Sequence, residues 1–210
     1  MDTSVLTPLI RMARFVVLFN IRRTFWMWRE SRLMPHRPDR KLLVGWILPE
    51  LSQPGSTILW VGCQPYTRPY LDAIERPGAK CWTLEIEPSA RRWGHPRRHI
   101  VGDLQMVGTL YLPCQFDVAL VNGVFGYGLN TQSGQNKAIE GLARVLKPGG
   151  LLMLGWNTHR TSDPLGLSAI ERFYTRSQRP GFEQRITFPE STHVYDFFAL
   201  RDDYCGLDSS

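Results

Sequence analysis

Residues 57–67 read TILWVGCQPYT, a stretch that indicates the fold class of the chain. Its first six residues are rich in β-formers and end at a glycine, which is typical of a strand that enters a nucleotide-binding loop. Such loops usually contain two or three glycines, yet after Gly62 the next glycine is Gly78. The stretch therefore predicts a strand followed by a binding loop of unusual composition. That loop consists of Cys63, Gln64, Pro65 and Tyr66.

Downstream of this stretch, segments with strand and helix patterns alternate, which predicts an α/β fold with a doubly wound, mostly parallel sheet. Only the four residues PEST separate the last two strands, so we expect a hairpin and an antiparallel final strand. The predicted strands are residues 57–62, 80–86, 99–102, 116–121, 150–156, 184–188 and 193–200. The predicted helices are residues 67–76, 88–94, 103–110, 132–147 and 164–177.

Polar residues and glycines stand where the predicted strands end, and in such a sheet the ligand binds beyond those ends. Glu85 closes the second strand, at the spacing from Gly62 where dinucleotide folds place an acid for the ribose hydroxyls. Asp103 follows the third strand, where a carboxylate can accept from an adenine amino group or cap the next helix. Asn122 and Gly123 follow the fourth strand and open a loop rich in glycine and aromatic residues.

Taken together, these segments resemble the class I S-adenosylmethionine (SAM)-dependent methyltransferases, over roughly residues 55–200. The motifs that carry the resemblance, in order, are ILWVGCQ, LEIEPSA, VGDLQ, FDVALVNGVFGYGL, LKPGGLLMLGWN and the closing strand THVYDFFALR. The resemblance implies SAM as cofactor, as methyl donor or as the substrate itself. It also implies cofactor-binding roles for Gly62, Gln64, Tyr66, Glu85, Ile86, Asp103, Leu104, Asn122 and Gly123.

The first loop departs from that family's usual acid-x-Gly-x-Gly pattern. Trp60 stands at the acid position and Gln64 at the second glycine. The usual acid binds the ammonium group of the cofactor's amino-acid tail, which a tryptophan cannot do. Gln64, Tyr66 and Thr67 offer polar contacts instead. We also expect the N-terminal segment to close over this end, with an arginine for the carboxylate or Trp26 or Trp28 against the sulfonium.

Candidate catalytic residues are Asn122, Tyr127 and His193. A lone histidine is more often structural than catalytic, and the same reservation applies to His36 and His159. No metal-binding pattern is recognised, because the four cysteines form no CxxC pair and lack zinc spacing. Free thiols and the lack of an apolar span or signal peptide are typical of a cytoplasmic protein.

The charge of the chain is concentrated at its N-terminus. Residues 1–41 contain nine Lys or Arg and three Asp or Glu, whereas the remaining residues contain sixteen of each. A helical pattern over residues 5–34 ends at Pro35 and Pro38, and a short helix follows at residues 41–51. We therefore divide the chain into a basic helical lid or arm (1–50), a SAM-binding domain (51–203) and a tail (204–210). Membrane contact by the arm is a weaker alternative to a lid role.

Three functions stay open from the sequence. The first is methyl transfer from SAM to a small molecule, since the chain is short and has no inserted substrate domain. The second is cyclisation of SAM to azetidine-2-carboxylate with release of methylthioadenosine, as in the azetidine-2-carboxylate synthases. The third is a non-catalytic partner subunit. A nucleic-acid substrate is not favoured, because the body is neutral and NGVF replaces the NPPY-like turn of the base methylators. The sequence leaves the oligomeric state open.

Overall fold

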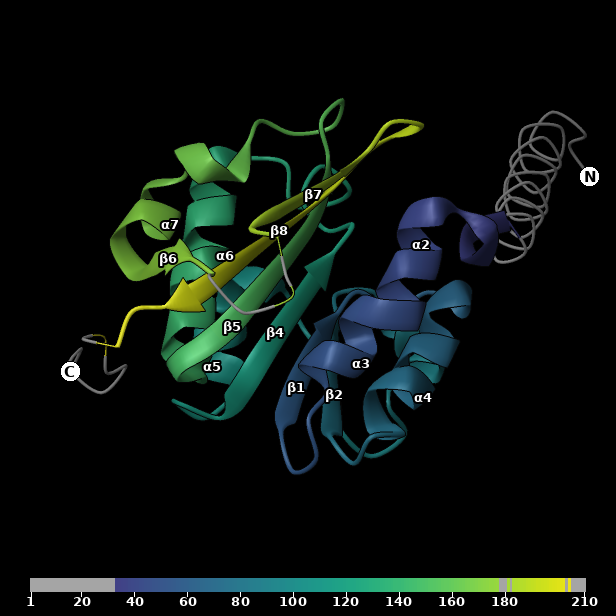
Figure 1. Cartoon of the computed structure of the whole chain (residues 1–210). Coiled ribbons are helices and arrows are strands. Elements are labelled where there is room, and N and C mark those ends of the chain that lie inside the picture. The colour runs from purple at the N-terminus through teal and green to yellow at the C-terminus, as the bar shows by residue number, and fades with distance from the viewer. Residues whose placement is uncertain (1–32, 178–180, 182, 203, 205–210) are drawn as a thin grey trace, which may run out of the picture.

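The computed structural model describes residues 33–177, 181, 183–202 and 204. Within them one mixed sheet has the order β3-β2-β1-β4-β5-β8-β6, with β7 also paired to β8 (Figure 1). The parallel strands are β1 (Thr57–Val61), β2 (Lys80–Glu85), β3 (His99–Val101), β4 (Phe116–Asn122) and β5 (Leu146–Asn157). Strand β8 (Ser191–Leu200) runs antiparallel to β5, to β6 (Tyr174–Arg176) and to β7 (Arg185–Phe188). The predicted doubly wound sheet with an antiparallel C-terminal hairpin is confirmed.

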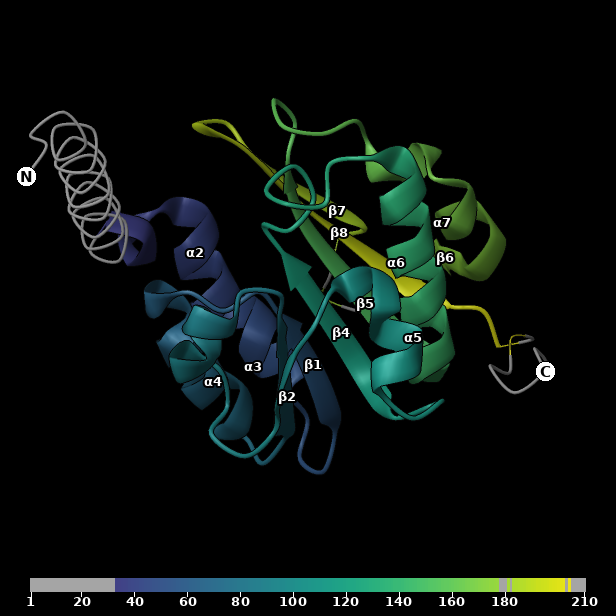
Figure 2. The ribbon, with the colours of Figure 1, turned by 180° about the vertical axis from the view of Figure 1, so that it is seen from behind.

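Helices cover both faces of the sheet (Figures 1 and 2). One face carries α5 (Val107–Leu110), α6 (Gln132–Val145) and α7 (Ser168–Phe173). The other carries α2 (Pro38–Leu42), the helical turns of η2 (Leu43–Ile47), α3 (Leu48–Leu51) and α4 (Arg68–Glu75). Alternate residues of β1 enter the two cores, because successive side chains of a strand point to opposite faces. Leu59 packs with α6 and Trp60 with α4.

Three predicted helices differ from the observed structure, and the one predicted at residues 103–110 is a 3₁₀ turn at Leu104–Met106 followed by the short α5. The predicted helix at residues 164–177 ends at Phe173, and residues 174–176 form β6 on the outer edge of β8. Tyr174 is buried there and its hydroxyl donates to the carbonyl of Ile139, so tertiary packing outweighs the helical pattern. Residues 88–93 form a tight 3₁₀ segment after Pro88 in place of an α-helix.

The described part of the N-terminal segment is packed into the core. Leu43, Ile47, Leu48 and Leu51 are buried in one cluster with Trp60 and other residues of the sheet. This burial fixes α2 at the edge of the sheet's carboxyl end. Residues 1–32, which include most of the predicted lid with Trp26 and Trp28, lie outside the described residues. The division of the chain at residue 50 therefore stays a prediction. Within the described part, no helix has the length and apolarity required to span a bilayer.

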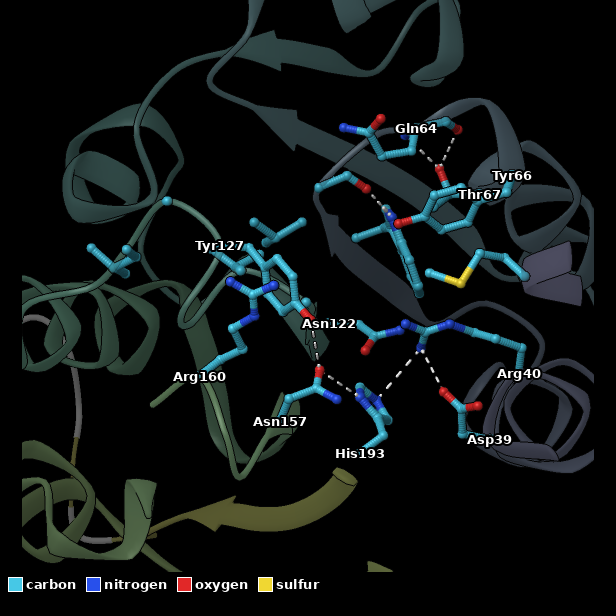
Figure 3. A pocket seen from close by; sticks show the side chains of 18 of the residues that line it. Asp39, Arg40, Gln64, Tyr66, Thr67, Asn122, Tyr127, Asn157, Arg160 and His193 are labelled. Carbon is cyan, nitrogen blue, oxygen red and sulfur yellow. Dashed lines mark hydrogen bonds and ion pairs between the residues drawn. The ribbon is translucent and has the colours of Figure 1, made fainter. Parts of the chain in front are cut away.

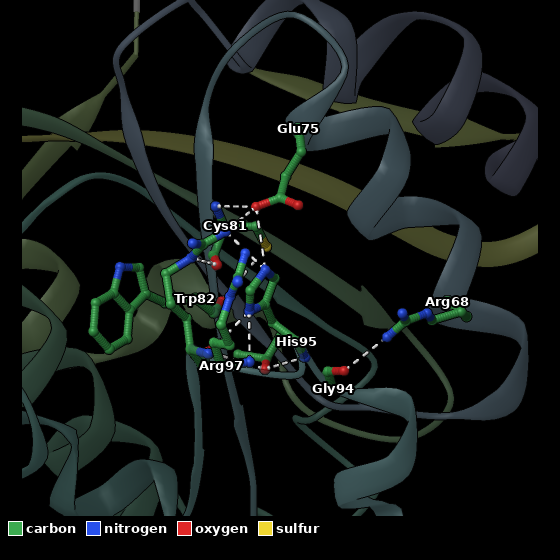
Figure 4. A network of polar contacts seen from close by, with 9 residues as sticks. Arg68, Glu75, Cys81, Trp82, Gly94, His95 and Arg97 are labelled. Carbon is green, nitrogen blue, oxygen red and sulfur yellow. Dashed lines mark hydrogen bonds and ion pairs between the residues drawn. The ribbon is translucent and has the colours of Figure 1, made fainter.

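A polar network on the edge of the sheet joins α4 to β2 and β3 (Figure 4). Arg98 donates to the carboxylate of Glu75 and to the carbonyl of Cys81, the latter at 2.9 Å. The imidazole of His95 contacts the side chains of Arg98 and Glu75, and burial together with Arg98 lowers its pKa. Arg68 donates to the carbonyl of Gly94. These contacts fasten α4, whose preceding loop forms one wall of the site described below.

Candidate functional site

A cavity of about 890 Å³ opens at the carboxyl ends of β1, β2, β4 and β5. Every cofactor-binding and catalytic candidate from the sequence lines it, although the individual roles stay predictions. These residues are Gly62, Gln64, Tyr66, Glu85, Ile86, Asp103, Leu104, Asn122, Gly123, Tyr127 and His193. The structure brings them together because parallel strands present their carboxyl ends at the same edge of a sheet.

The first loop folds without a second glycine. Gly62 has a φ of +91°, a conformation that favours glycine. Gln64 is extended, with φ −134° and ψ 163°, so any residue fits there. Its N–H donates to the hydroxyl oxygen of Thr67 at 3.0 Å, and Pro65 begins the short helical turn that follows. The unusual composition is therefore compatible with a well-formed loop.

Trp60, which occupies the usual acid position, is a core side chain. It is 1% exposed, and its indole stacks edge-to-face with Tyr70 at a centroid distance of 5.3 Å. The indole N–H donates to the carbonyl of Gly62, which pins the start of the loop. Strand β1 thus supplies no carboxylate for an ammonium group.

Two carboxylates are held by backbone donors at the other end of the cavity. Glu85 accepts from the N–H of Cys63 at 2.7 Å and from that of Glu87 at 2.9 Å. Each carboxylate oxygen keeps a lone pair for a further donor, such as a sugar hydroxyl. Asp103 accepts from the backbone N–H and the side-chain amide of Gln105, so it also caps the turn that follows. Beside them, Ile86 is 63% exposed.

Asn122 ends β4 and turns its amide toward β5. Its Oδ1 is buried and has no hydrogen-bond partner among the described residues. A Cβ on Gly155 would lie 2.1 Å from that oxygen, so a side chain at residue 155 would require the Asn122 amide to move. Gly123 has a φ of +68° and donates its N–H to the carbonyl of Gly155 at 2.8 Å. The two strand ends are therefore tightly coupled.

His193 belongs to a hydrogen-bonded wall that the sequence did not reveal (Figure 3). Its Nδ1 lies 3.2 Å from Oδ1 of Asn157, which also accepts from the hydroxyl of Tyr127. Its Nε2 lies 3.5 Å from Nη1 of Arg40. An arginine donates only, so Nε2 accepts and the proton resides on Nδ1. Burial, with Arg40 and Arg37 nearby, lowers the pKa of His193 to about 3. A neutral imidazole with both nitrogens engaged is a poor general base at neutral pH.

Asp39, Arg40 and Asn157 belong to none of the motifs recognised in the sequence. Asp39 and Arg40 reach the cavity from α2, outside the Rossmann-like core, and no local pattern marks them. The expectation that the N-terminal segment supplies an arginine is the one signal that pointed to Arg40. Asn157 ends β5, so reading that strand end would have found it. His159 also lines the cavity, with Nδ1 2.7 Å from Oγ1 of Thr192.

The fold of the chain is similar to that of several solved methyltransferase structures. The N-methyltransferase NodS from Bradyrhizobium japonicum WM9, in complex with S-adenosylhomocysteine (SAH), has a TM-score of 0.60 and 19% identity, over 83% of this chain and 96% of that one. The Burkholderia thailandensis 1,6-didemethyltoxoflavin-N1-methyltransferase, solved with 1,6-didemethyltoxoflavin and SAH, has a TM-score of 0.53 and 15% identity, over 96% and 92%. A TehB-like SAM-dependent methyltransferase from Corynebacterium glutamicum has a TM-score of 0.55 and 20% identity, over 82% of this chain and 99% of that one. No family model and no curated sequence matches the chain.

At these identities the likeness establishes the fold. The chain has the Rossmann-like fold of the SAM-dependent methyltransferases, over nearly the whole length of these structures.

Proposed function

We propose that the chain is a SAM-dependent enzyme that transfers a methyl group to a small molecule. The observation that carries this proposal is the Glu85 carboxylate, which stands at the end of β2 and is oriented by the N–H of Cys63 from the first loop. In the proposed complex Glu85 binds the ribose hydroxyls and Asp103 receives the adenine amino group. Ile86 and Leu104 flank the base, and Gly62, Gln64 and Tyr66 line the path to the tail.

Bound SAM supplies an electrophilic methyl group on its sulfonium. The chain's part is to hold donor and acceptor in line, about 3 Å apart, and to exclude water. Asn122 and Gly123 at the end of β4 line the reacting end of the cavity. A strong base is optional for this displacement, so the neutral His193 is consistent with it. We assign His193 an orienting role toward Arg40 in place of the base role.

The dimensions of the chain support a small acceptor. The toxoflavin methyltransferase, whose structure holds 1,6-didemethyltoxoflavin, covers nearly the same length as this chain. Residues 42–210 have no net charge excess, since the surplus of Lys and Arg lies in residues 1–41. Nucleic-acid binding relies on clustered positive charge, so the neutral body argues against such a substrate.

Cyclisation of SAM is the second candidate, and Trp60 is the observation that favours it. In that reaction the amino nitrogen attacks the γ-carbon, the bond from that carbon to sulfur breaks, and methylthioadenosine leaves with the electron pair. The nitrogen must be unprotonated, and a carboxylate beside it would oppose this. Trp60 removes that carboxylate from β1. The non-catalytic alternative rested on an irregular first loop, and the extended backbone at Gln64 removes that reason.

The test is to incubate the purified protein with SAM alone and to identify the products by mass spectrometry, with heat-treated protein as the background. The same preparation is titrated with SAH by calorimetry. We expect SAH to bind and SAM to remain intact until an acceptor is added. Methylthioadenosine with azetidine-2-carboxylate above background would replace methyl transfer with cyclisation. A protein that binds neither SAM nor SAH would overturn both candidates.

A further inference from the structure

Arg40 is a buried cation whose side chain is only partly paired by the described residues. Its side chain is 7% exposed and lines the cavity. The contacts it makes with described residues all leave from Nη1, which lies 3.1 Å from the hydroxyl of Tyr195, 3.5 Å from His193 and 3.7 Å from the carboxylate of Asp39. Its Nε has no partner in the described part of the chain. A guanidinium has five N–H donors, so the described residues occupy only part of its hydrogen-bonding capacity.

Asp39, the preceding residue, is also buried and only partly paired by the described residues. Its side chain is 3% exposed, and Oδ1 has no hydrogen-bond partner among the described residues. The 3.7 Å contact with Arg40 is an ion pair without a short hydrogen bond. Burying two charges is costly unless each is paired and hydrogen-bonded. A pair left in this state beside a cavity is suited to a ligand with one negative and one positive group.

The fold holds this pair in place firmly. The hydroxyl of Tyr195 accepts from Arg40 and donates to the backbone carbonyl of Asp39 at 3.1 Å. Tyr195 is fully buried in β8, and Leu43 and Ile47, which follow α2 in the chain, are fully buried in the same core. The two charged side chains are therefore presented by a fixed element, and a ligand need not order them.

The position of the pair identifies the part of the ligand that it faces. Arg40 interacts electrostatically with Tyr66, in the loop after β1, and with Tyr70 at the start of α4. Trp60 lies at the same end of the cavity and packs against Tyr70. Glu85 and Asp103, which would hold the adenosine, follow β2 and β3 instead. The pair thus faces the end of the cavity where the resemblance places the amino-acid tail.

We propose that Asp39 and Arg40 bind the α-amino-acid tail of SAM, with Arg40 receiving the carboxylate and Asp39 the ammonium group. This inference rests on the function proposed above. Strand β1 has Trp60 at the position of the usual acid, and α2 supplies a carboxylate at the same end of the cavity. A carboxylate beside the amino group favours its protonated form. The pair therefore favours methyl transfer over cyclisation, which requires the free amine.

The test compares two ligands that differ in the tail. SAH has the complete amino-acid tail, whereas methylthioadenosine ends in a methylthio group. Calorimetry with both ligands is carried out on the wild-type protein and on Arg40→Gln, Arg40→Lys and Asp39→Asn. Lys41→Gln is the matched control, because Lys41 is an exposed cation on the same helix and does not line the cavity. Thermal unfolding of each variant verifies that it is folded.

We expect Arg40→Gln to weaken SAH binding about 10- to 100-fold, the range for loss of a hydrogen-bonded charge, and methylthioadenosine binding less than threefold. Arg40→Lys keeps the positive charge but loses the paired N–H donors of the guanidinium, so we expect it to retain part of the SAH affinity. Asp39→Asn weakens SAH binding in the same selective way. Equal losses for both ligands, or unchanged SAH binding in all three variants, would overturn the proposal while leaving the proposed function intact. A wild-type protein that binds neither ligand would overturn the function itself. If Arg40→Gln does not fold, Arg40→Lys and Asp39→Asn decide the question.

Discussion

Arg40 and Tyr195 are 155 residues apart in the chain, yet a 3.1 Å hydrogen bond joins them beneath the cavity. The bond links α2 to the antiparallel strand β8, so the C-terminal hairpin determines where the N-terminal charged pair lies. We assign Tyr195 the role of a positioning residue, because it acts on the ligand only through Asp39 and Arg40.

Replacing Tyr195 by phenylalanine keeps the ring and removes this link. We expect Tyr195→Phe to weaken SAH binding several-fold and to leave methylthioadenosine binding unchanged, because only the tail subsite loosens. Tyr174→Phe is the matched control. Tyr174 is also buried, and its hydroxyl donates a hydrogen bond to the carbonyl of Ile139 on the far side of the sheet. An equal effect of both substitutions on the SAH affinity would show a general loss of stability instead.

Glu85 tests the adenosine half of the cavity. Glu85→Ala removes the proposed acceptor of the ribose hydroxyls and the acceptor for the N–H of Cys63. We expect SAH and methylthioadenosine to bind at least tenfold more weakly, consistent with hydrogen bonds worth about 1–3 kcal/mol. This pattern differs from that expected for Arg40→Gln, which weakens the binding of SAH much more than the binding of methylthioadenosine. Glu50→Ala, at an exposed acid on α3, is the control, and unchanged affinity in Glu85→Ala would remove the assigned ribose site.

The contact between Gly155 and Asn122 predicts a strong local effect. A methyl group on Gly155 would collide with Oδ1 of Asn122 and approach the ring of Tyr195. We expect Gly155→Ala to lower the free energy of unfolding by about 1–3 kcal/mol, the usual cost of overpacking. Gly45→Ala is the contrasting substitution, because Gly45 is helical and its added methyl meets open space. There we expect a gain of up to about 1 kcal/mol. Urea unfolding measures both, and equal stability of the two variants would contradict the close approach of β4 and β5 at these residues.

Substitutions at Trp60 are expected to change the stability of the fold, so the free energy of unfolding is measured before activity. Trp60→Asp would restore the usual acid of the first strand, but it would also place a charge in the core beside Tyr70. We expect the free energy of unfolding to fall by about 3–5 kcal/mol or more, as for other large core truncations. Trp60→Phe removes the indole N–H to Gly62 and should cost less. A folded and stable Trp60→Asp protein in urea titration would contradict the core role of this residue.

The buried histidine predicts how stability depends on pH. The pKa of His193 is lowered from 6.5 to about 3, first by burial and then by Arg40 and Arg37, and its ring also packs against Tyr195. Between these two pH values the unfolded chain binds a proton that the folded chain does not, so stability falls as the pH falls below about 6.5. One proton corresponds to a slope of about 1.4 kcal/mol per pH unit.

His193→Gln removes this contribution, while the lowered pKa values of His95 and His99 still act. We therefore expect the variant to lose less stability than the wild type between pH 6.5 and pH 4.5 in urea unfolding. Parallel curves for the two proteins would show that His193 does not titrate differently on folding.

The sheet, the parallel orientation of most of its strands and the antiparallel final strand could all be predicted from the sequence. These features follow from local information, namely the periodicity of apolar residues and the short turn before β8, which each segment carries in its own residues. The ring of strand-end residues could be predicted too, because parallel strands bring their carboxyl ends together whatever the side chains are. The strand β6 escaped prediction because three residues at an edge form a strand only when β8 offers its backbone.

The charged pair at the Trp60 end of the cavity could be recognised only in the folded chain. Asp39 and Arg40 are unremarkable in a basic segment, and their burial depends on Leu43 and Ile47 docking onto the sheet. The neutral state of His193 likewise depends on burial and on Arg40, a residue far away in the chain. Contacts between distant segments and the desolvation that accompanies them have no local sequence pattern, and they set the charges in this cavity.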